Sequence, residues 1–493
     1  MPKDYFEKLS DHKSPPTYKF FNGEKWVNSV SDKTIDVISP LDDHVVGKIQ
    51  SVTHAEIDQA VSLAKVAQKE WMKVPMIKRT QILHLAADWI REHEHYLTTL
   101  LIKEIGKTHT EAKDEILRSA DMTDYFAHEG LHLTGEELSG EAFPGYDQTK
   151  IAIVERVPLG VVLAIAPFNY PVNLSVSKIA PALITGNAVV FKPPTQGAIC
   201  SLLLTEIFRI AGVPDGVIVT ITGSGNDVGD YLTTHPGIDM VTFTGSSQVG
   251  KSIAEKIGMI PILFECGGNN PALVLPDADF DNTAMEIVKG AFSYSGQRCT
   301  AVKYVLGLTP TIEKLLPLVV KKTKEMIKMG DPRVGENNLG PVISDGAANE
   351  IEKRIILAKA AGAKIVLGGK KDGRFIEPTI LDHVTLAMDI IHTETFGPVV
   401  GFIRVKSIDD AIELINQSSY GLQASIFTKD EGAGIKLGQL IDVGTVQINS
   451  KPQRGPDNFP FLGIKGSGTG VQGIRYTLEA MTRFKPIVLN KPQ

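Results

Sequence analysis

Cys299 lies in a stretch whose residue types suit nucleophilic chemistry. It follows Arg298 in the segment 293–300, between a helical run that ends at Gly296 and a β-branched run, so we expect it on a loop facing a cleft. A thiolate is a strong nucleophile, and the Arg298 charge would favour it if the two come close. The alternative is a small buried apolar residue, as Cys200 is expected to be within its apolar helix.

A glutamate and an asparagine stand where apolar strands end. Glu265 closes one such strand and precedes two glycines, and Asn169 follows another in APFNYP, residues 166–171. Glu265 is either a member of a buried ion pair or a base at the carboxyl edge of a sheet. Asn169 is either a turn residue or an amide donor to an oxyanion. Cys266 would face away from Glu265 and is expected in the core.

Together the three residue types fit one reaction. A thiolate attacks an aldehyde carbonyl, while an amide and a backbone N–H steady the oxyanion. A hydride then leaves for a nicotinamide, and the product is a thioester. A glutamate activates the water that releases the acid. The combination of Cys299, Glu265 and Asn169 therefore predicts the oxidation of an aldehyde.

A competing motif is GSSQVGKS at 245–252, which satisfies the phosphate-loop pattern of nucleotide hydrolases. An apolar strand precedes it and a helical stretch follows, as that loop requires. The hydrolase interpretation lacks an acidic partner, however, because the nearest apolar run that ends in an aspartate, at Asp277, is interrupted by proline.

Composition limits the remaining classes of function. The chain has 493 residues, 43% of them apolar, and a formal net charge of −6, which argues against a nucleic-acid scaffold. Three cysteines without a C-x-x-C pair make neither a disulfide framework nor a zinc site, so we expect no metal and a reducing, cytoplasmic location. The N-terminal residues do not form a signal peptide, and we expect no membrane segment.

The elements that position these residues alternate between strand and helix. Continuous apolar strands separated by amphipathic helices predict a parallel sheet covered on both faces, Rossmann-like, within an α/β protein. Residues 271–460 repeat the alternation as a second α/β unit, and the first quarter is mostly helical, including runs over 76–104 and 109–135. The apolar tail FKPIVLN has no evident place in either unit and suggests pairing with another chain. The expected strands of the first sheet are 161–166, 188–192, 217–221, 239–243 and 261–265.

Six motifs make the chain resemble the aldehyde dehydrogenase superfamily over nearly its full length: APFNYP, FKPPT, FTGS, ECGGNN, GQRCT and ETFGPV. The resemblance implies Cys299 as nucleophile, Glu265 as general base and Asn169 as oxyanion donor. It also implies a Rossmann-like cofactor domain, an α/β catalytic domain and a small β oligomerisation arm. We assign 1–142 and 163–264 to the cofactor domain, 265–460 to the catalytic domain, and 143–162 and 461–493 to the arm.

The resemblance places 245–250 at the family's dinucleotide loop, so Lys251 becomes a helix-surface residue. The neutral Thr195 would not repel a 2′-phosphate, which favours NADP, with NAD possible as well. The implied cofactor-binding residues are Lys192, Thr195, Gly225, Phe243, Gly245, Ser246, Glu394 and Phe396.

Arginines indicate the substrate. GQRCT and the QRG-DNFPF segment resemble the non-phosphorylating glyceraldehyde-3-phosphate dehydrogenases, in which the matching positions bind a phosphate. The implied substrate residues are Arg118, Tyr170, Arg298 and Arg454. The implied reaction converts D-glyceraldehyde 3-phosphate, NADP and water into 3-phosphoglycerate and NADPH, as a step of glycolysis. We also expect the enzyme to be a homotetramer.

Two alternatives stay open within the family. One is another anionic aldehyde such as succinate semialdehyde, which Arg298 or Arg454 would also suit. The other is a non-catalytic member used for structure, which the presence of all three catalytic residue types disfavours. The branch commonly reads LGG followed by a lysine, whereas this chain has Cys266 and Asn269, a departure that concerns the substrate more than the mechanism.

Overall fold

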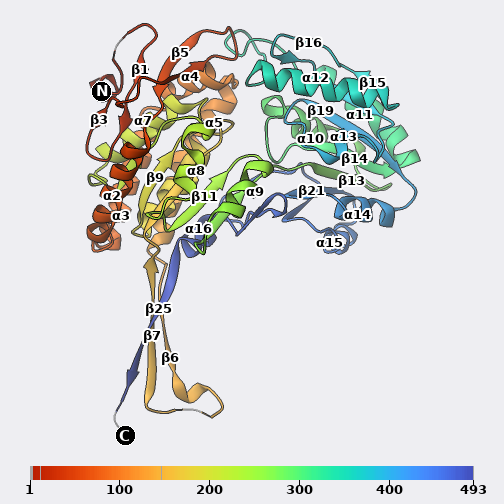
Figure 1. Cartoon of the computed structure of the whole chain (residues 1–493). Coiled ribbons are helices and arrows are strands. Elements are labelled where there is room, and N and C mark those ends of the chain that lie inside the picture. The colour runs from red at the N-terminus through yellow and green to blue at the C-terminus, as the bar shows by residue number, and fades with distance from the viewer. Residues whose placement is uncertain (1–3, 12, 146, 492–493) are drawn as a thin grey trace.

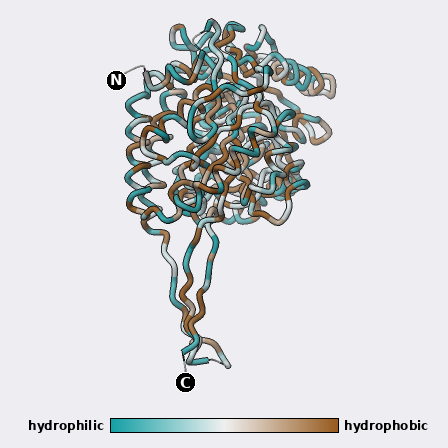
Figure 2. Tube along the Cα trace, turned by 60° about the vertical axis from the view of Figure 1, so that its left-hand side comes forward, coloured by the Kyte–Doolittle hydropathy of each residue, from teal (hydrophilic) through white to brown (hydrophobic). Residues whose placement is uncertain are grey.

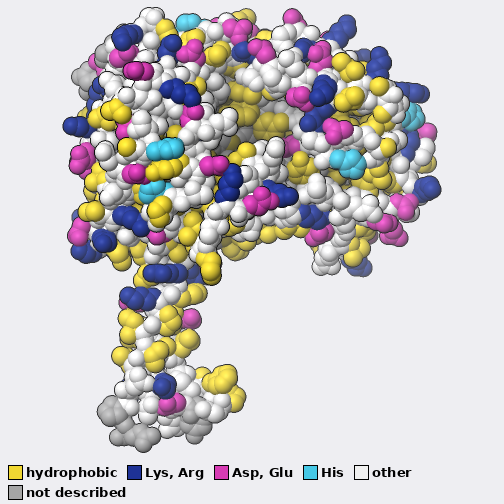
Figure 3. All heavy atoms as spheres, in the orientation of Figure 1, with side chains coloured by type: hydrophobic (Ala, Val, Ile, Leu, Met, Phe, Trp, Pro, Cys, Tyr) yellow, Lys and Arg dark blue, Asp and Glu magenta, His cyan; other side chains and the backbone are white. Residues whose placement is uncertain are grey.

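The computed structural model describes residues 4–11, 13–145 and 147–491. Figure 1 shows two lobes side by side and an arm of strands that projects from the first lobe. In the same orientation, the space-filling view shows a recess with hydrophobic side chains between the two lobes (Figure 3). Within the described residues, no helix is both long enough and apolar enough to cross a membrane.

A six-stranded sheet forms the centre of the first lobe, in the order β10-β9-β8-β11-β12-β24. Only the short edge strand β24 is antiparallel to its neighbour. The five parallel strands lie within one residue of their predicted bounds, which confirms the Rossmann-like sheet. The strands are β8 Val161–Ile165, β9 Ala188–Lys192, β10 Ile218–Thr220, β11 Met240–Thr244, β12 Ile262–Glu265 and β24 Gly468–Thr469.

Helices cover both faces of this sheet, which explains its continuous apolar strands. Val162 and Ala164 of β8 pack into the cluster that holds α6 and α7, whereas Val161 and Leu163 pack into the one that holds α2 and α9. Alternate side chains of a strand point to opposite faces, so both faces must be apolar. These helices are α2 His54–Trp71, α6 Asn173–Ile184, α7 Ala198–Ile210, α8 Asp230–Thr233 and α9 Ser247–Lys256.

The N-terminal quarter is helical, as predicted, but 76–104 is not one helix. His93 has a non-helical ψ of 14°, and the chain divides there. The resulting helices are α3 Met76–Glu92, α4 Glu94–Ile105 and α5 His109–Gly130. Before them lie the short helix α1 Asp4–Glu7 and the strands β1 Thr17–Tyr18, β2 Phe20–Phe21, β3 Trp26–Val27, β4 Thr34–Ile38 and β5 Val45–Gln50.

The second lobe has a seven-stranded sheet in the order β15-β18-β19-β14-β13-β21-β22, parallel except for the edge strand β15. This confirms the second α/β unit, although the strands β15 and β18 were not predicted. The strands are β13 Asn270–Val274, β14 Val302–Leu308, β15 Lys364–Leu367, β18 Thr379–Asp382, β19 Val399–Val405, β21 Gln423–Phe427 and β22 Thr445–Ile448. The covering helices are α10 Phe280–Phe292, α11 Thr309–Met326, α12 Asp345–Ala360, α13 Asp389–His392, α14 Ile408–Asn416 and α15 Glu431–Gly438.

The arm is a three-stranded antiparallel sheet in the order β25-β7-β6. The apolar tail has a partner within the chain, because β25 pairs with β7 over its whole length, from Thr482 opposite Pro158 to Asn490 opposite Lys150. Pairing with another chain stays a prediction, and β25 is an edge strand. Hydrophobic stretches run along the arm (Figure 2), at 151–154 in β7 and at 487–489 in β25. Its strands are β6 Glu136–Ser139, β7 Lys150–Pro158 and β25 Thr482–Asn490.

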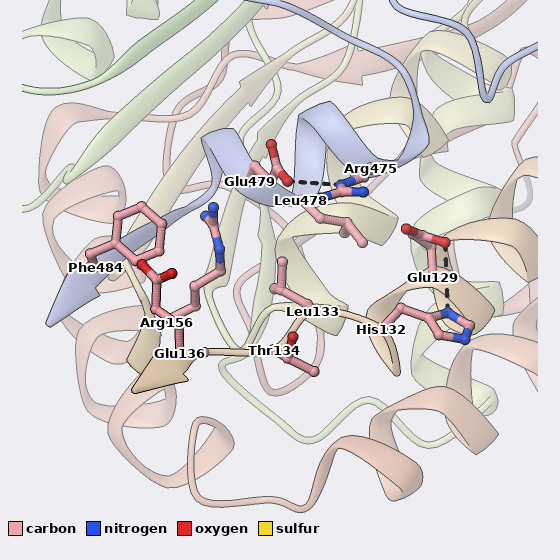
Figure 4. Close-up of a pocket in the computed structure, with 11 residues that line it drawn as sticks. Glu129, His132, Leu133, Thr134, Glu136, Arg156, Arg475, Leu478, Glu479 and Phe484 are labelled. Carbon is pink, nitrogen blue, oxygen red and sulfur yellow. Dashed lines mark hydrogen bonds and ion pairs between the residues drawn. The ribbon is translucent and has the colours of Figure 1, made fainter. Parts of the chain in front are cut away.

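The segment 461–481 lies outside the arm strands to which the sequence assigned it. It adds β24 to the first sheet, and its helix α16, Ile474–Ala480, packs on α5 and α6. A cavity of 240 Å³ lies where the arm joins this lobe. Around it Arg475 pairs with Glu479 at 2.9 Å, and Arg156 stacks on the ring of Phe484 (Figure 4).

Candidate active site

Cys299 lies on a tight loop between α10 and β14, as predicted. Tyr294 and Ser295 take left-handed conformations, with φ of 49° and 52°, in the turn that precedes it. Asn270, the first residue of β13, donates from its side-chain amide to the carbonyl oxygens of Cys299 and Ala301, both at 2.8 Å. The loop is therefore held to the second sheet at the cysteine and just after it.

Glu265, the last residue of β12, faces this cysteine. The Cys299 thiol donates to Glu265 Oε1 at 3.3 Å, and Arg454 Nη1 donates to Glu265 Oε2 at 2.6 Å. The Glu265 residue is only 2% exposed. A base and a thiol within hydrogen-bond reach form the arrangement that nucleophilic catalysis requires.

The thiol itself is held protonated by its surroundings. Burial raises the pKa of Cys299 well above its usual value, the charges of Glu265 and Glu394 raise it further, and Arg454 lowers it. Arg298 does not come near enough to meet the condition under which it would favour the thiolate. Its guanidinium points to Ser293, to Thr300 Oγ1 at 3.0 Å and to the carbonyl oxygen of Pro452 at 3.1 Å.

Two glycines allow these groups to come together. A Cβ on Gly267 would overlap the Glu394 carboxylate, and one on Gly268 would overlap the Cys299 carbonyl oxygen. Neither glycine has a positive φ, so close approach rather than backbone freedom is the reason for glycine here. Gly268 N–H also donates to Glu394 Oε1 at 3.1 Å.

Asn169 lies on the loop after β8, and its side chain is directed toward the cysteine loop. Its amide donates to the Gln297 carbonyl oxygen at 3.0 Å. A side-chain amide has two N–H donors, so one remains for an oxyanion. Asn169 and Cys299 line the same cavity.

That cavity has a volume of 470 Å³ and lies at the carboxyl ends of β8 and β11. Five of the predicted cofactor residues line it: Phe243, Gly245, Ser246, Glu394 and Phe396. Lys192, Thr195 and Gly225 do not line it. Lys192 ends β9 beside Ile165, and burial lowers its pKa to about 8.

The entrance to α9 suits a dinucleotide phosphate. Ser246 caps the helix by accepting from the Val249 N–H, and the helix N-terminus carries partial positive charge. Lys251 is a surface residue, as predicted: its side chain is 80% exposed and lies 4.0 Å from Glu255. It is not a phosphate clamp, which removes the support for a nucleotide hydrolase.

A second cavity, of 210 Å³, adjoins the first and shares Cys299 with it. All four residues predicted for the substrate line this cavity together with Glu265: Arg118, Tyr170, Arg298 and Arg454. The cysteine thus lies between a larger, mostly apolar cavity and a smaller one lined by cations.

A buried ion pair lies behind Tyr170. The Lys107 ammonium lies 3.5 Å from the centroid of the Tyr170 ring and pairs with Glu115, and both charged side chains are fully buried. Glu115 also accepts the N–H groups of Val172 and Asn173, where α6 begins without a side-chain cap of its own. The pair therefore fixes the loop that carries Asn169 and Tyr170.

The sequence did not single out several residues of the site. Lys178, fully buried on α6, donates to Thr244 Oγ1 at 2.7 Å, and burial lowers its pKa to about 7. Lys451 lines the smaller cavity, and Asp457 accepts both Arg118 Nε at 2.8 Å and Nη2 at 2.7 Å. Lys178 could have been singled out from the sequence, because it is a lysine within an apolar helical run.

Comparison with known proteins gives one consistent result. A family model described as the aldehyde dehydrogenase family matches residues 26–487. The NADP-dependent glyceraldehyde-3-phosphate dehydrogenase of Pisum sativum is 44% identical, over 96% of this chain and 96% of that protein. The enzyme of the same name from Streptococcus equinus is 45% identical, over 96% and 98%.

Comparison with a solved structure gives the same result. The NADP-dependent glyceraldehyde-3-phosphate dehydrogenase from Bacillus halodurans C-125, complexed with NADP, superposes with a TM-score of 0.93 at 46% identity. The match covers 96% of this chain and 99% of that one.

Replacing Glu265 with Gln is expected to speed the alkylation of Cys299 by iodoacetamide at pH 7. The substitution removes the nearest negative charge, so the pKa of the thiol falls. The thiolate fraction rises about tenfold for each unit by which the pKa falls. The nucleophilicity of the thiolate falls less steeply, so we expect the alkylation rate to rise roughly several-fold. Mass spectrometry of the Cys299 peptide over time gives the rate. Glu255→Gln, on the exposed face of α9, is the control, and an unchanged or slower rate in Glu265→Gln would contradict the arrangement.

Proposed function

The chain belongs to the aldehyde dehydrogenase family, and from this premise we propose that it oxidises D-glyceraldehyde 3-phosphate to 3-phosphoglycerate with NADP and water, without inorganic phosphate. One observation carries the proposal. Cys299 faces Glu265 at the junction of two cavities, and three arginines line the smaller of them. A thiol paired with a carboxylate suits attack on an aldehyde, and a cavity lined by cations suits an aldehyde that carries negative charge.

The first half of the reaction forms a covalent adduct. Glu265 Oε1, which accepts the thiol proton at 3.3 Å, takes that proton as Cys299 sulfur bonds to the aldehyde carbon. The carbonyl oxygen becomes an oxyanion, which accepts the free N–H of the Asn169 amide and the backbone N–H of Cys299. The product is a thiohemiacetal on Cys299.

The larger cavity fits NADP by its construction. A capped helix N-terminus, small residues at 245–246 and the Phe396 ring surround a volume of 470 Å³ that reaches Cys299. NADP, when bound, supplies the acceptor for the hydride that leaves the carbon of the adduct. Glu394 and Phe396 would hold the nicotinamide end there, and Lys192, Thr195 and Gly225 the adenosine end.

The second half releases the acid. Glu265 first releases the thiol proton to solvent and so becomes a carboxylate again. Water then attacks the carbonyl carbon of the Cys299 thioester, and Glu265 takes a proton from that water. The carbon–sulfur bond then breaks, the acid departs, and Cys299 leaves as thiolate and is reprotonated. Arg454 donates to Glu265 Oε2 at 2.6 Å and so orients the carboxylate that serves both halves.

We also propose a homotetramer and a cytoplasmic location. The arm supports the first, because β25 presents exposed apolar side chains, Phe484, Ile487, Val488 and Leu489, along an edge strand. All three cysteines are free, which fits a reducing compartment.

Absorbance at 340 nm is expected to rise when the protein meets NADP and D-glyceraldehyde 3-phosphate in phosphate-free buffer, because hydride transfer makes NADPH. Turnover is expected to proceed without added inorganic phosphate. NAD in place of NADP tests the cofactor preference. Turnover of succinate semialdehyde without turnover of the phosphorylated aldehyde would overturn the substrate and leave the catalytic residues in place.

Glu265→Gln is expected to give a burst of NADPH, about one per active site, without steady turnover. The amide cannot take a proton from water, so the thioester accumulates, whereas the more acidic thiol still adds to the aldehyde. Rapid-mixing absorbance measures the burst, and acid quenching followed by mass spectrometry detects the acyl group on Cys299. Loss of the burst together with turnover would place the essential role of Glu265 before the thioester.

Light scattering after size exclusion is expected to give the mass of a tetramer for the full chain. The double substitution Phe484→Asp and Val488→Asp, at two exposed residues of β25, should reduce the measured mass to that of a smaller species. The reason is that charges would replace apolar side chains that the proposed tetramer buries between its subunits. Val334→Asp, at an exposed apolar residue of the second lobe, is the matched control. A monomeric unmodified chain would contradict the tetramer.

A further inference from the structure

The smaller cavity holds more positive charge than its four predicted residues suggest. Lys451 lines it as well, beside Arg298 and Arg454. Which of these cations is available to an anion depends on the contacts each already makes. The inference below rests on the proposed function, because it concerns how the same cavity holds its substrate.

Two of the cations are already matched by carboxylates. Arg118 donates two hydrogen bonds to Asp457, at 2.8 and 2.7 Å, and a third to the carbonyl oxygen of Arg454 at 3.1 Å. Arg454 pairs with Glu265 at 2.6 Å. A guanidinium with a bidentate carboxylate has most of its charge compensated, so an anion gains less from it.

Two other cations have no such partner. Across the described parts of the chain, neither Arg298 nor Lys451 has a carboxylate oxygen within 4.0 Å of its charged nitrogens. Arg298, which is only 8% exposed, donates to neutral oxygens alone. The Lys451 ammonium donates to the Gln453 side-chain oxygen at 2.8 Å.

The two cations are close enough to disturb one another. Burial lowers the pKa of Lys451, the charge of Arg298 lowers it further, and the charge of Glu286 offsets part of that shift. Two neighbouring cations at a half-buried site repel, and a dianion between them removes that repulsion while accepting charge-assisted hydrogen bonds.

The loop that carries them is fixed. Lys451 follows β22, and its backbone N–H donates to Glu286 Oε2 at 2.9 Å on α10. Arg298 donates to the backbone of the same loop, at the Pro452 carbonyl oxygen, at 3.1 Å. Little reordering is therefore needed when an anion arrives, which favours affinity.

We propose that Lys451 is a ligand of the anionic group of the substrate, which it binds together with Arg298, while Asp457 holds Arg118 in place at the wall of the cavity. The group that fits is a phosphate monoester dianion, since two uncompensated cations match two negative charges. Lys451 thereby distinguishes phosphorylated from neutral aldehydes.

Lys451→Met tests this assignment by the ratio of KM values for D-glyceraldehyde 3-phosphate and D-glyceraldehyde. Loss of a charge-assisted hydrogen bond is expected to raise KM for the phosphorylated aldehyde roughly 10- to 100-fold and to leave KM for glyceraldehyde within about twofold. Lys451→Arg, which keeps the charge, should recover most of the difference. Lys289→Met removes a nearby charge that does not line the cavity and is the matched control.

A second readout does not need turnover of that aldehyde. Glycerol 3-phosphate should slow the iodoacetamide alkylation of Cys299 in the unmodified protein, and about tenfold more of it should be needed in Lys451→Met. Equal changes in both KM values, or equal protection in both proteins, would overturn the role of Lys451. If the unmodified protein fails to oxidise D-glyceraldehyde 3-phosphate but is protected in this way, the proposed reaction fails and the anion site stands.

Discussion

The closeness of Glu265 to Cys299 depends on the four residues, 266–269, that carry the chain from the first sheet to the second. Glu265, the proposed base, is the last residue of β12, and Asn270, which holds the cysteine loop, is the first residue of β13. A side chain on Gly267 would displace the Glu394 carboxylate, and one on Gly268 would overlap the Cys299 carbonyl oxygen. The catalytic geometry is thus set by the shortest connection between the two lobes.

Charge in the site is balanced through shared partners. Glu265 raises the pKa of the thiol, Arg454 lowers it, and the same Arg454 binds the carboxylate that has to act as base. Because three groups share two contacts, the effects of substitutions among them will not add. In the adjoining cavity Asp457 is paired with Arg118 and Glu265 with Arg454, whereas Arg298 has no carboxylate oxygen within 4.0 Å among the described residues.

Sequence reasoning predicted what periodic apolar patterns and strand ends determine. The parallel strands were found because burial on both faces makes them continuously apolar, and Glu265 and Asn169 because they follow such strands. The strand β15 was missed because it is a partly exposed edge strand without a continuous apolar pattern, and β18 because it begins directly after Pro378. Contacts between distant residues, such as Arg118 with Asp457, 339 positions apart, have no local signal, so the actual partners of the arginines were not predictable.

The pairing of β25 with β7 has a consequence for the order in which the molecule is completed. During synthesis β7 emerges before either sheet is finished, whereas its partner emerges after both. Until then β7 pairs with β6 alone and leaves one edge open. A nascent chain thus carries an unfinished arm while its lobes fold, and the arm is closed last. The proposed association of subunits through the arm would therefore have to wait until translation has passed the residues of the site.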